Sequence, residues 1–246
     1  MTRARYSVSK SALAGLLFGV TALAAVAISG IGYRLGGWHF TVGLQVTEWA
    51  VYGAAFALAL SAVGLFQARP QARHRGFVLA ILGVAAALPV VAMGLQWEYA
   101  TRTYPPINDI STDMEEAPVF WDMPNPTDYP GAETAALQRA AYPGLAPLEL
   151  AMPPEKAFAH ALAVAQGRGW EIVASVPQEG RIEATDSSFL YGFTDEITVR
   201  VAPSDGGARV DVRSRSRIGR IDRGVNAKRI RAYLKSLQAH AVTAAR

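Results

Sequence analysis

The 246-residue chain contains no cysteine. This absence excludes disulfide bonds, thiol catalysis, thiolate metal sites and lipid modification of an N-terminal cysteine. Histidine is also scarce, with four residues in all. Two of them, His160 and His240, fall within expected helices without a neighbour at ligand spacing, so we expect packing or surface roles for both. We therefore expect no metal site and no cofactor.

The usual enzyme signatures are missing as well. The sequence has no glycine-rich phosphate loop, no nucleophile-elbow serine and no HExxH motif. Ser187 and Ser188 follow Asp186, but neither serine comes with a recognisable base or oxyanion site. The sequence thus leaves any catalytic residues unknown.

Charged residues make up only 18% of the chain, and they are unevenly placed. Up to Leu95, seven basic residues stand against the single acid Glu48, whereas the rest of the chain holds 17 basic and 19 acidic residues. The net charge of +4 therefore comes from the apolar N-terminal part, and no basic footprint covers the remainder. We expect no nucleic-acid partner.

Three long apolar runs, 11–32, 42–66 and 76–95, fill the first hundred residues. As helices that rise about 1.5 Å per residue, they match the roughly 30 Å hydrocarbon layer of a bilayer. They predict a three-helix transmembrane anchor in residues 1–96 and an extracytoplasmic domain in residues 97–246. The lipid bilayer is therefore the first expected partner.

The basic residues beside these runs predict the orientation of the anchor. The hairpin 33–41 contains only Arg34, and the other basic residues lie before the first run or between the second and third: Arg3, Arg5, Lys10, Arg69, Arg73 and Arg75. Positively charged flanks stay in the cytoplasm. We therefore expect a multi-pass protein of the bacterial inner membrane, with a cytoplasmic N-terminus and a periplasmic C-terminal domain.

One carboxylate, Glu48, lies within the second run. An intramembrane carboxylate is a functional candidate by default. However, Glu48 lies only about six residues, or roughly 9 Å, from the outer end of that helix. A plain position at the membrane interface is the alternative.

The rest of the sequence predicts an α+β domain. Residues 97–153 are rich in proline, which predicts an extended wrapping segment with one short helix at 132–141. Residues 154–246 predict a core in the order α-β-β-β-β-α. Its second helix is expected at 226–241, capped by Asn226. The other core elements are a helix that begins at Pro154 and strands at 170–176, 181–187, 196–202 and 208–216. The predicted fold is a four-stranded antiparallel sheet packed on two helices.

Side chains alternate between apolar and charged along the expected strands. Apolar residues such as Ile197 and Val199 would face the two helices. Charged residues of both signs, such as Glu183, Glu196 and Arg213, would form the other face, which an antiparallel sheet can present to water.

Arginines are concentrated near the C-terminus. From Arg209 onward, eleven basic residues stand against Asp211 and Asp222. Guanidinium groups at this density suit the bidentate binding of phosphate or carboxylate. The candidates for binding an anion or a partner are Arg213, Arg215, Arg217, Arg220, Arg223 and Arg229.

Internal pairing is the alternative for these arginines. In that arrangement they meet acidic residues of their own domain and fix the wrapping segment. The expected pairing partners are Asp109, Asp113, Glu183, Asp186, Asp195 and Glu196. The acidic candidates for a structural role or for a site are Asp109, Asp186, Asp195 and Asp211. Both interpretations stay open at the level of sequence.

Four stretches of the domain carry a family resemblance: PPINDISTD (105–113), GWEIV (169–173), IEATDSSFLYGFTDEITVRV (182–201) and RVDVRSRSRIGRIDRGVNAKRIRAYL (209–234). In these stretches the chain resembles proteins that contain domain of unknown function 1499, found in bacteria and plastids. The resemblance covers essentially all of the domain and none of the apolar runs. It implies membrane attachment, which is common among members, and no particular activity, because the family has no agreed one.

These observations favour a non-catalytic periplasmic module. It would bind an anionic envelope component, such as a lipid headgroup or a glycan, or scaffold another envelope protein. Replacing Arg213 and Arg215 would then weaken binding more than it lowers thermal stability.

Two other functions compete with this hypothesis. One is an envelope hydrolase or transferase that uses Asp109, Asp186 or Asp195 as acid or base. In the other, the transmembrane helices are the working part, with Glu48 at a helix contact.

Overall fold

A computed structural model describes residues 7–70, 72, 74–124 and 127–244. The chain forms two compact units. The helical unit comprises residues 1–99 and 189–192, and the α+β unit comprises residues 100–188 and 193–246. Arg3, Arg5 and Arg73, on which the predicted orientation partly depends, lie outside the described residues.

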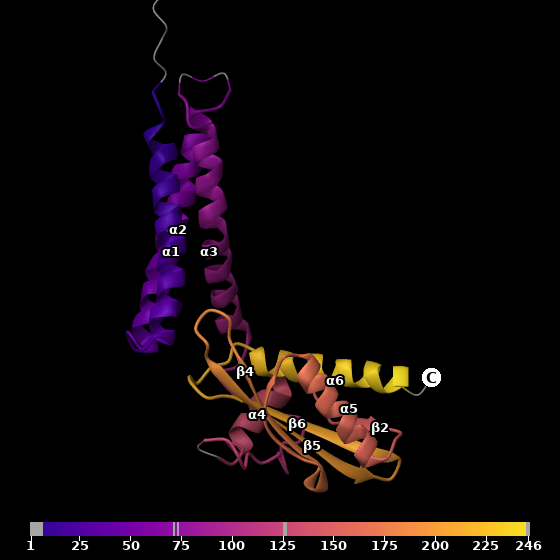
Figure 1. Ribbon diagram of the computed structural model, residues 1–246. Helices are drawn as coiled ribbons and strands as arrows, with labels where there is room; N and C mark the ends of the chain where they lie inside the picture. The colour runs from indigo at the N-terminus through magenta and orange to yellow at the C-terminus, as the bar shows by residue number, and fades with distance from the viewer. Residues whose placement is uncertain (1–6, 71, 73, 125–126, 245–246) are drawn as a thin grey trace, which may run out of the picture. The chain divides into compact units, whose positions relative to one another are not determined.

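The helical unit consists mainly of α1 (Lys10–Arg34), α2 (Phe40–Gln67) and α3 (Phe77–Thr103) (Figure 1). The three helices have 25, 28 and 27 residues and mean hydropathies of 2.2, 1.8 and 2.5, so each is long and apolar enough to cross a membrane. The three expected helices are thus confirmed. Helix α3 continues beyond its expected end at Leu95, and the boundary between the units falls inside it, after Tyr99.

Small residues line the contacts among these helices. A Cβ atom added at Gly64 of α2 would lie 2.6 Å from the Cα of Ala12 in α1. A Cβ atom added at Gly83 of α3 would lie 2.9 Å from the backbone nitrogen of Leu16. Both separations are too short for a real side chain, so glycine allows the helices to approach this closely.

Segment 189–192 contributes a polar group to the helical unit. The Tyr191 hydroxyl lies 3.0 Å from Ser29 Oγ and 2.6 Å from Thr47 Oγ1, and the last two oxygens are 2.8 Å apart. All three residues are buried. The three hydroxyls satisfy one another among apolar helices, where an unpaired polar group is costly.

Glu48 lies on an exposed face of α2. The hydroxyl of Tyr52, one turn further along the helix, donates a hydrogen bond to its carboxylate at 3.4 Å. The side chain of Glu48 is therefore exposed, and it is not buried in a contact with another helix of this chain.

A six-stranded antiparallel sheet forms the centre of the α+β unit. Its strands are β1 (Asp109–Ser111), β2 (Leu148–Leu150), β3 (Glu171–Val176), β4 (Arg181–Ser187), β5 (Thr194–Ser204) and β6 (Gly207–Ser216). The order is β1-β6-β5-β4-β3, and β2 also pairs with β6. The α+β class is confirmed, but the prediction of four strands is wrong.

The two missed strands, β1 and β2, come from the proline-rich segment 97–153. Each has three residues, which is too short to display an alternating pattern. Only their pairing with β6 makes them strands.

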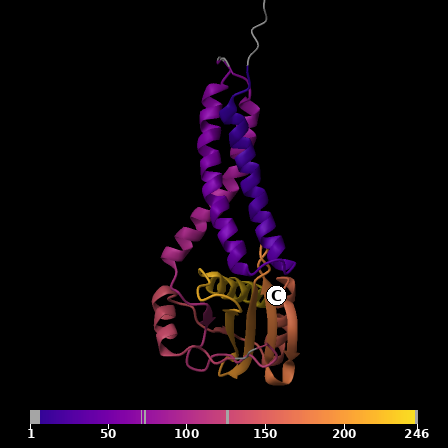
Figure 2. The same ribbon diagram turned by 90° about the vertical axis from the view of Figure 1, so that its left-hand side faces the viewer.

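Helices α5 (Pro154–Gly167) and α6 (Val225–Ala244) cover one face of this sheet (Figures 1 and 2). The short helix α4 (Ala132–Ala141) and the 3₁₀ turn η1 (Pro177–Glu179) complete the unit. The core between the sheet and α5 and α6 includes Phe158, Trp170, Ile182, Ile197, Val199, Val210, Val212, Ile230, Tyr233 and Leu237. The predicted helices and the apolar face of the sheet are therefore confirmed.

The expected cap of α6 is wrong. Helix α6 begins at Val225, and the carboxylate of Asp222 accepts hydrogen bonds from the backbone N–H groups of Gly224 at 2.8 Å and Asn226 at 2.9 Å. The Asn226 side chain instead accepts from Ser214 Oγ at 2.7 Å and donates to the Asn108 carbonyl at 3.0 Å. Aspartate can cap a helix as well as asparagine, and the sequence does not distinguish the two.

The charged face of the sheet is covered, contrary to the expectation that it faces water. The wrapping segment crosses this face, and its buried Phe120 ring lies against the guanidinium groups of Arg213 and Arg215. The backbone N–H groups of Trp121 and Asp122 donate to the Glu183 carboxylate at 2.7 and 3.0 Å. The charged side chains beneath are consequently buried: Glu183, Glu196, Asp211, Arg213 and Arg215.

Candidate functional site

Arg213 of β6 forms the most buried ion pair of the covered face. Its Nε and Nη2 atoms donate to the two carboxylate oxygens of Asp109 in β1, at 3.0 and 2.8 Å. It also donates to the carbonyl oxygens of Pro118 at 3.2 Å and Thr127 at 3.0 Å. Because Arg213 is only 1% exposed and Asp109 only 4%, this pair joins the wrapping segment to the sheet from inside the unit.

Two arginines share the carboxylate of Glu196 in β5. Arg215 Nε donates to Glu196 Oε2 at 2.7 Å, and Arg217 Nε donates to Oε1 at 2.9 Å. Arg215 is also bonded to Thr127 Oγ1 and lies over the ring of Phe120. One carboxylate neutralises only one guanidinium, so this group has one positive charge in excess.

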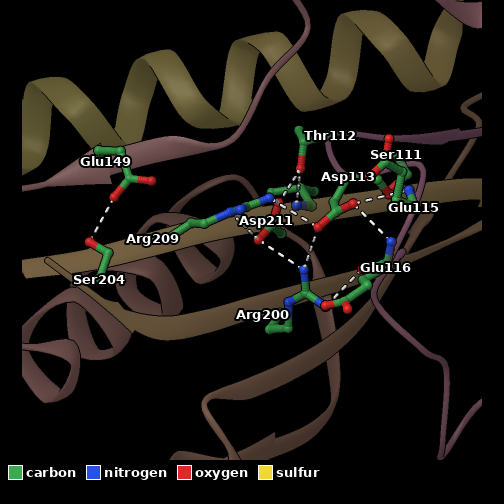
Figure 3. Close-up of polar contacts among 11 residues, drawn as sticks. Ser111, Thr112, Asp113, Glu115, Glu116, Glu149, Arg200, Ser204, Arg209 and Asp211 are labelled. Carbon is green, nitrogen blue, oxygen red and sulfur yellow. Dashed lines mark hydrogen bonds and ion pairs between the residues drawn. The ribbon is translucent and has the colours of Figure 1, made fainter.

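Figure 3 shows a second cluster, in which Arg200, Arg209, Asp113 and Asp211 form a group of balanced charge. Arg200 and Arg209 each donate to Asp113 Oδ2 at 3.0 Å, and both also contact Asp211. Partial burial favours the neutral form of Asp113. The backbone N–H groups of Glu116 and Glu115 and the Arg200 guanidinium outweigh that effect and lower the pKa of Asp113. The two carboxylates and two guanidinium groups of these four residues sum to no net charge.

Arg229 of α6 holds two carboxylates. Its Nε donates to Asp186 Oδ2 at 3.0 Å, and its Nη2 donates to Asp195 Oδ2 at 2.7 Å. Close by in the sequence, burial raises the pKa of the Asp222 carboxyl, although two backbone N–H groups oppose that shift. In contrast to the Glu196 group, the pairs around Arg229 have an excess of negative charge.

A hollow of about 280 Å³ lies beside the Glu196 group. Its volume suits a phosphate, a carboxylate or one small headgroup better than a large ligand. The side chain of Arg217 is 38% exposed and contributes to the lining. The lining residues are Asn108, Asp109, Pro124, Thr127, Pro130, Glu196, Arg215, Ser216 and Arg217.

The structure thus brings together some of the candidate arginines and separates others. Arg213, Arg215, Arg217 and Arg229 all form internal ion pairs. Arg223 bonds to Thr101 Oγ1 at 3.0 Å. Arg220 is exposed in the loop before α6. Of the six candidates, only Arg215 and Arg217 line the hollow.

The acidic candidates for catalysis are each bound to an arginine. Asp109 pairs with Arg213, and Asp186 and Asp195 pair with Arg229. Each of the three carboxylates already accepts hydrogen bonds from its guanidinium partner. The hydrolase or transferase alternative stays a prediction that this geometry does not favour.

Sequence reasoning missed several lining residues, Asn108 and Thr127 among them, and it missed the contact between two histidines. Asn108 and Thr127 line the hollow but lie in the segment that was expected only to wrap the domain. His160 and His240 are neighbours in space although they are 80 residues apart in the chain. The PPINDISTD stretch, which contains Asn108, was the only signal for any of these.

Comparison with known families agrees with the motifs of the sequence. The family model described as "Protein of unknown function (DUF1499)" matches residues 109–237, which is more than half of the chain. The chain belongs to the DUF1499 family. The DUF1499 match runs from β1 into α6, so all the ion pairs described above lie within it.

Other comparisons add little to the DUF1499 assignment. No curated protein matches the chain. Among solved structures, protein CV1439 from Chromobacterium violaceum is similar at 15% identity, covering 39% of this chain and 91% of that chain, with a TM-score of 0.27. A likeness at this TM-score carries no argument about fold or function.

Proposed function

We propose that this DUF1499 protein is a non-catalytic envelope module that binds an anionic group in the hollow beside Arg217. The observation that carries the proposal is the sharing of Glu196 by Arg215 and Arg217. The excess positive charge lies at a hollow that Asn108 and Thr127 also line. An anion in the hollow would complete the charge balance and gain charge-assisted hydrogen bonds.

Within this proposal, the arginines have different roles. Arg213 is inaccessible and satisfied by Asp109 and two carbonyl groups, so its role is to hold the wrapping segment. Arg217 is partly exposed and has a guanidinium edge available to a ligand after its Nε has bonded to Glu196. Arg217, and not Arg213, is therefore the residue to change in a binding test.

We expect the Arg217→Gln variant to lose a bound anionic molecule that the unchanged protein retains. The measurement is native mass spectrometry of the full chain, extracted gently from its own membrane. Lys235→Gln, which removes the same charge at an exposed position of α6, is the matched control. A phosphate- or carboxylate-bearing mass that persists in the control and disappears in Arg217→Gln would support the proposal and identify the ligand class. Bare masses in all three proteins, or an adduct that survives Arg217→Gln, would contradict it.

We also propose that helices α1 to α3 anchor the protein in the bacterial inner membrane, with the α+β unit in the periplasm. Basic residues Lys10, Arg69 and Arg75 lie at or near the ends of helices on the side proposed to be cytoplasmic. The contact of Ser9 N with the Arg75 carbonyl at 2.9 Å supports placing the start of α1 and the start of α3 on the same side.

The absence of cysteine allows a clean test of this orientation, because any introduced cysteine is the only thiol. We expect Asp205→Cys, in the turn between β5 and β6, to react with a membrane-impermeant maleimide once the periplasm is accessible. Ala72→Cys, between α2 and α3, should react only after the inner membrane is permeabilised. The opposite pattern would reverse the proposed orientation.

A further inference from the structure

Two histidines from different helices meet on the surface of the α+β unit. His160 of α5 and His240 of α6 place their Nδ1 atoms 2.9 Å apart, with ring centroids 4.9 Å apart at an interplanar angle of 67°. His160 is half-buried and His240 is exposed, so solutes can reach the pair. They belong to neither the hollow nor the ion pairs of the covered face.

The packing of α5 on α6 fixes the separation of the two rings. The Tyr233 hydroxyl of α6 donates to the Ala161 carbonyl of α5 at 2.9 Å. The same Tyr233 ring stacks on Trp170 with centroids 4.9 Å apart. Because Ala161, Tyr233 and Leu237 are all fully buried, the two helices form a rigid support for the histidine pair.

The distance between the two nitrogens suits a particular coordination geometry. With metal–nitrogen bonds of about 2.0–2.1 Å, donors at this separation subtend an angle of about 90° at a shared ion. That angle belongs to neighbouring positions of a square-planar or octahedral ion, whereas a tetrahedral ion needs its donors about 3.3 Å apart. Imidazole is a preferred ligand of Cu²⁺ and Ni²⁺, and Cu²⁺ binds most tightly to a given nitrogen site.

We propose that His160 and His240 form a chelating site for a square-planar or octahedral divalent transition-metal ion, and that Cu²⁺ is the ion bound most tightly. Among the described residues, no group of three or more histidine, cysteine, aspartate or glutamate side chains is placed to hold a metal. Water therefore fills the remaining coordination positions, and the site is an open, two-nitrogen one. In the metal-free protein the same separation fits a hydrogen bond from one ring to the other, and on metal binding the donor ring carries its proton on Nε2, so that both Nδ1 atoms coordinate the ion.

The test uses the full chain in detergent, purified with a tag that contains no histidine. Cu²⁺ is titrated by calorimetry, and its nitrogen ligands are counted by electron paramagnetic resonance. We expect one Cu²⁺ per chain with two imidazole nitrogens, and an affinity at least about tenfold weaker in His160→Ala and in His240→Ala. The matched controls are His39→Ala and His74→Ala, which remove the other two histidines of the chain and should leave the affinity unchanged.

Several results would overturn the proposal. These are a spectrum without two nitrogen ligands, equal affinities in all four variants, or tighter binding of Zn²⁺ than of Cu²⁺. Because His240 is exposed, His240→Gln should fold normally and keeps the test decisive if His160→Ala does not fold. Circular dichroism of each variant establishes that the loss concerns the ligand and not the fold.

Discussion

Arg213→Met should lower the free energy of unfolding of the α+β unit by about 3–5 kcal/mol, the usual effect of breaking a buried ion pair. The variant leaves the carboxylate of Asp109 buried without its bidentate partner, and it leaves the carbonyl groups of Pro118 and Thr127 without a donor. Such a loss is a large fraction of the roughly 5–15 kcal/mol that stabilises an ordinary domain. The loss of stability is measured by urea unfolding of the full chain, with hydrogen exchange of the β6 amides as the readout.

Two matched variants make this test specific. Arg220→Met removes an exposed arginine from the loop before α6 and should change the stability by less than about 0.5 kcal/mol. The double variant Arg213→Met with Asp109→Leu removes both charges and should recover more than half of the loss, because no buried charge is left unpaired. An Arg213→Met variant as stable as Arg220→Met would show that the pair is not part of the structural core.

Glu183→Ala should release the wrapping segment from the sheet and cost about 3 kcal/mol. Glu183 is fully buried in β4 and accepts from the backbone N–H groups of Trp121 and Asp122 and from Arg181 Nη1 at 2.7 Å. Without the carboxylate the two backbone N–H groups lose their acceptor, whereas Arg181 keeps its bonds to Asp122 and Glu179. We therefore expect the amide hydrogens of Trp121 and Asp122 to exchange much faster, which hydrogen-exchange mass spectrometry of the full chain measures.

Glu179→Ala is the control for this second prediction. Glu179 pairs with the same Arg181 at 3.0 Å, but its side chain is 58% exposed. An exposed ion pair contributes only about 0–1 kcal/mol, so this variant should leave the wrapping segment protected. If the Trp121 and Asp122 amides exchange as slowly in Glu183→Ala as in Glu179→Ala, then other contacts, such as those of the buried Phe120 ring, hold the segment.

These expected effects revise the interpretation of the arginine-rich stretch. From sequence, Arg213 and Arg215 were the residues whose loss should affect binding more than stability. In the structure, Arg213 is inside the unit, and Arg217 is the partly exposed member of the pair that shares Glu196. A structural role for Arg213 and a binding role for Arg217 are compatible, because Arg213 lies inside β6 and is buried, whereas Arg217 follows directly after the last residue of β6 and is partly exposed.

The sequence alone determined much of the organisation. Three long apolar runs predicted α1, α2 and α3, because only long helices of that composition bury such runs in a bilayer. The alternation in β3 to β6 and the apolar stripes of α5 and α6 predicted the core of the α+β unit, because these periodicities reflect which side chains are buried.

The tertiary structure decided what local patterns do not contain. Strands β1 and β2 exist only through pairing with β6, and the charged sheet face is buried only because a segment distant in sequence crosses it. The partner of each arginine, the hollow beside Arg217 and the meeting of His160 with His240 likewise depend on contacts between residues far apart in the chain. Charge and residue type name the groups that can interact, but the folded backbone selects which of them meet.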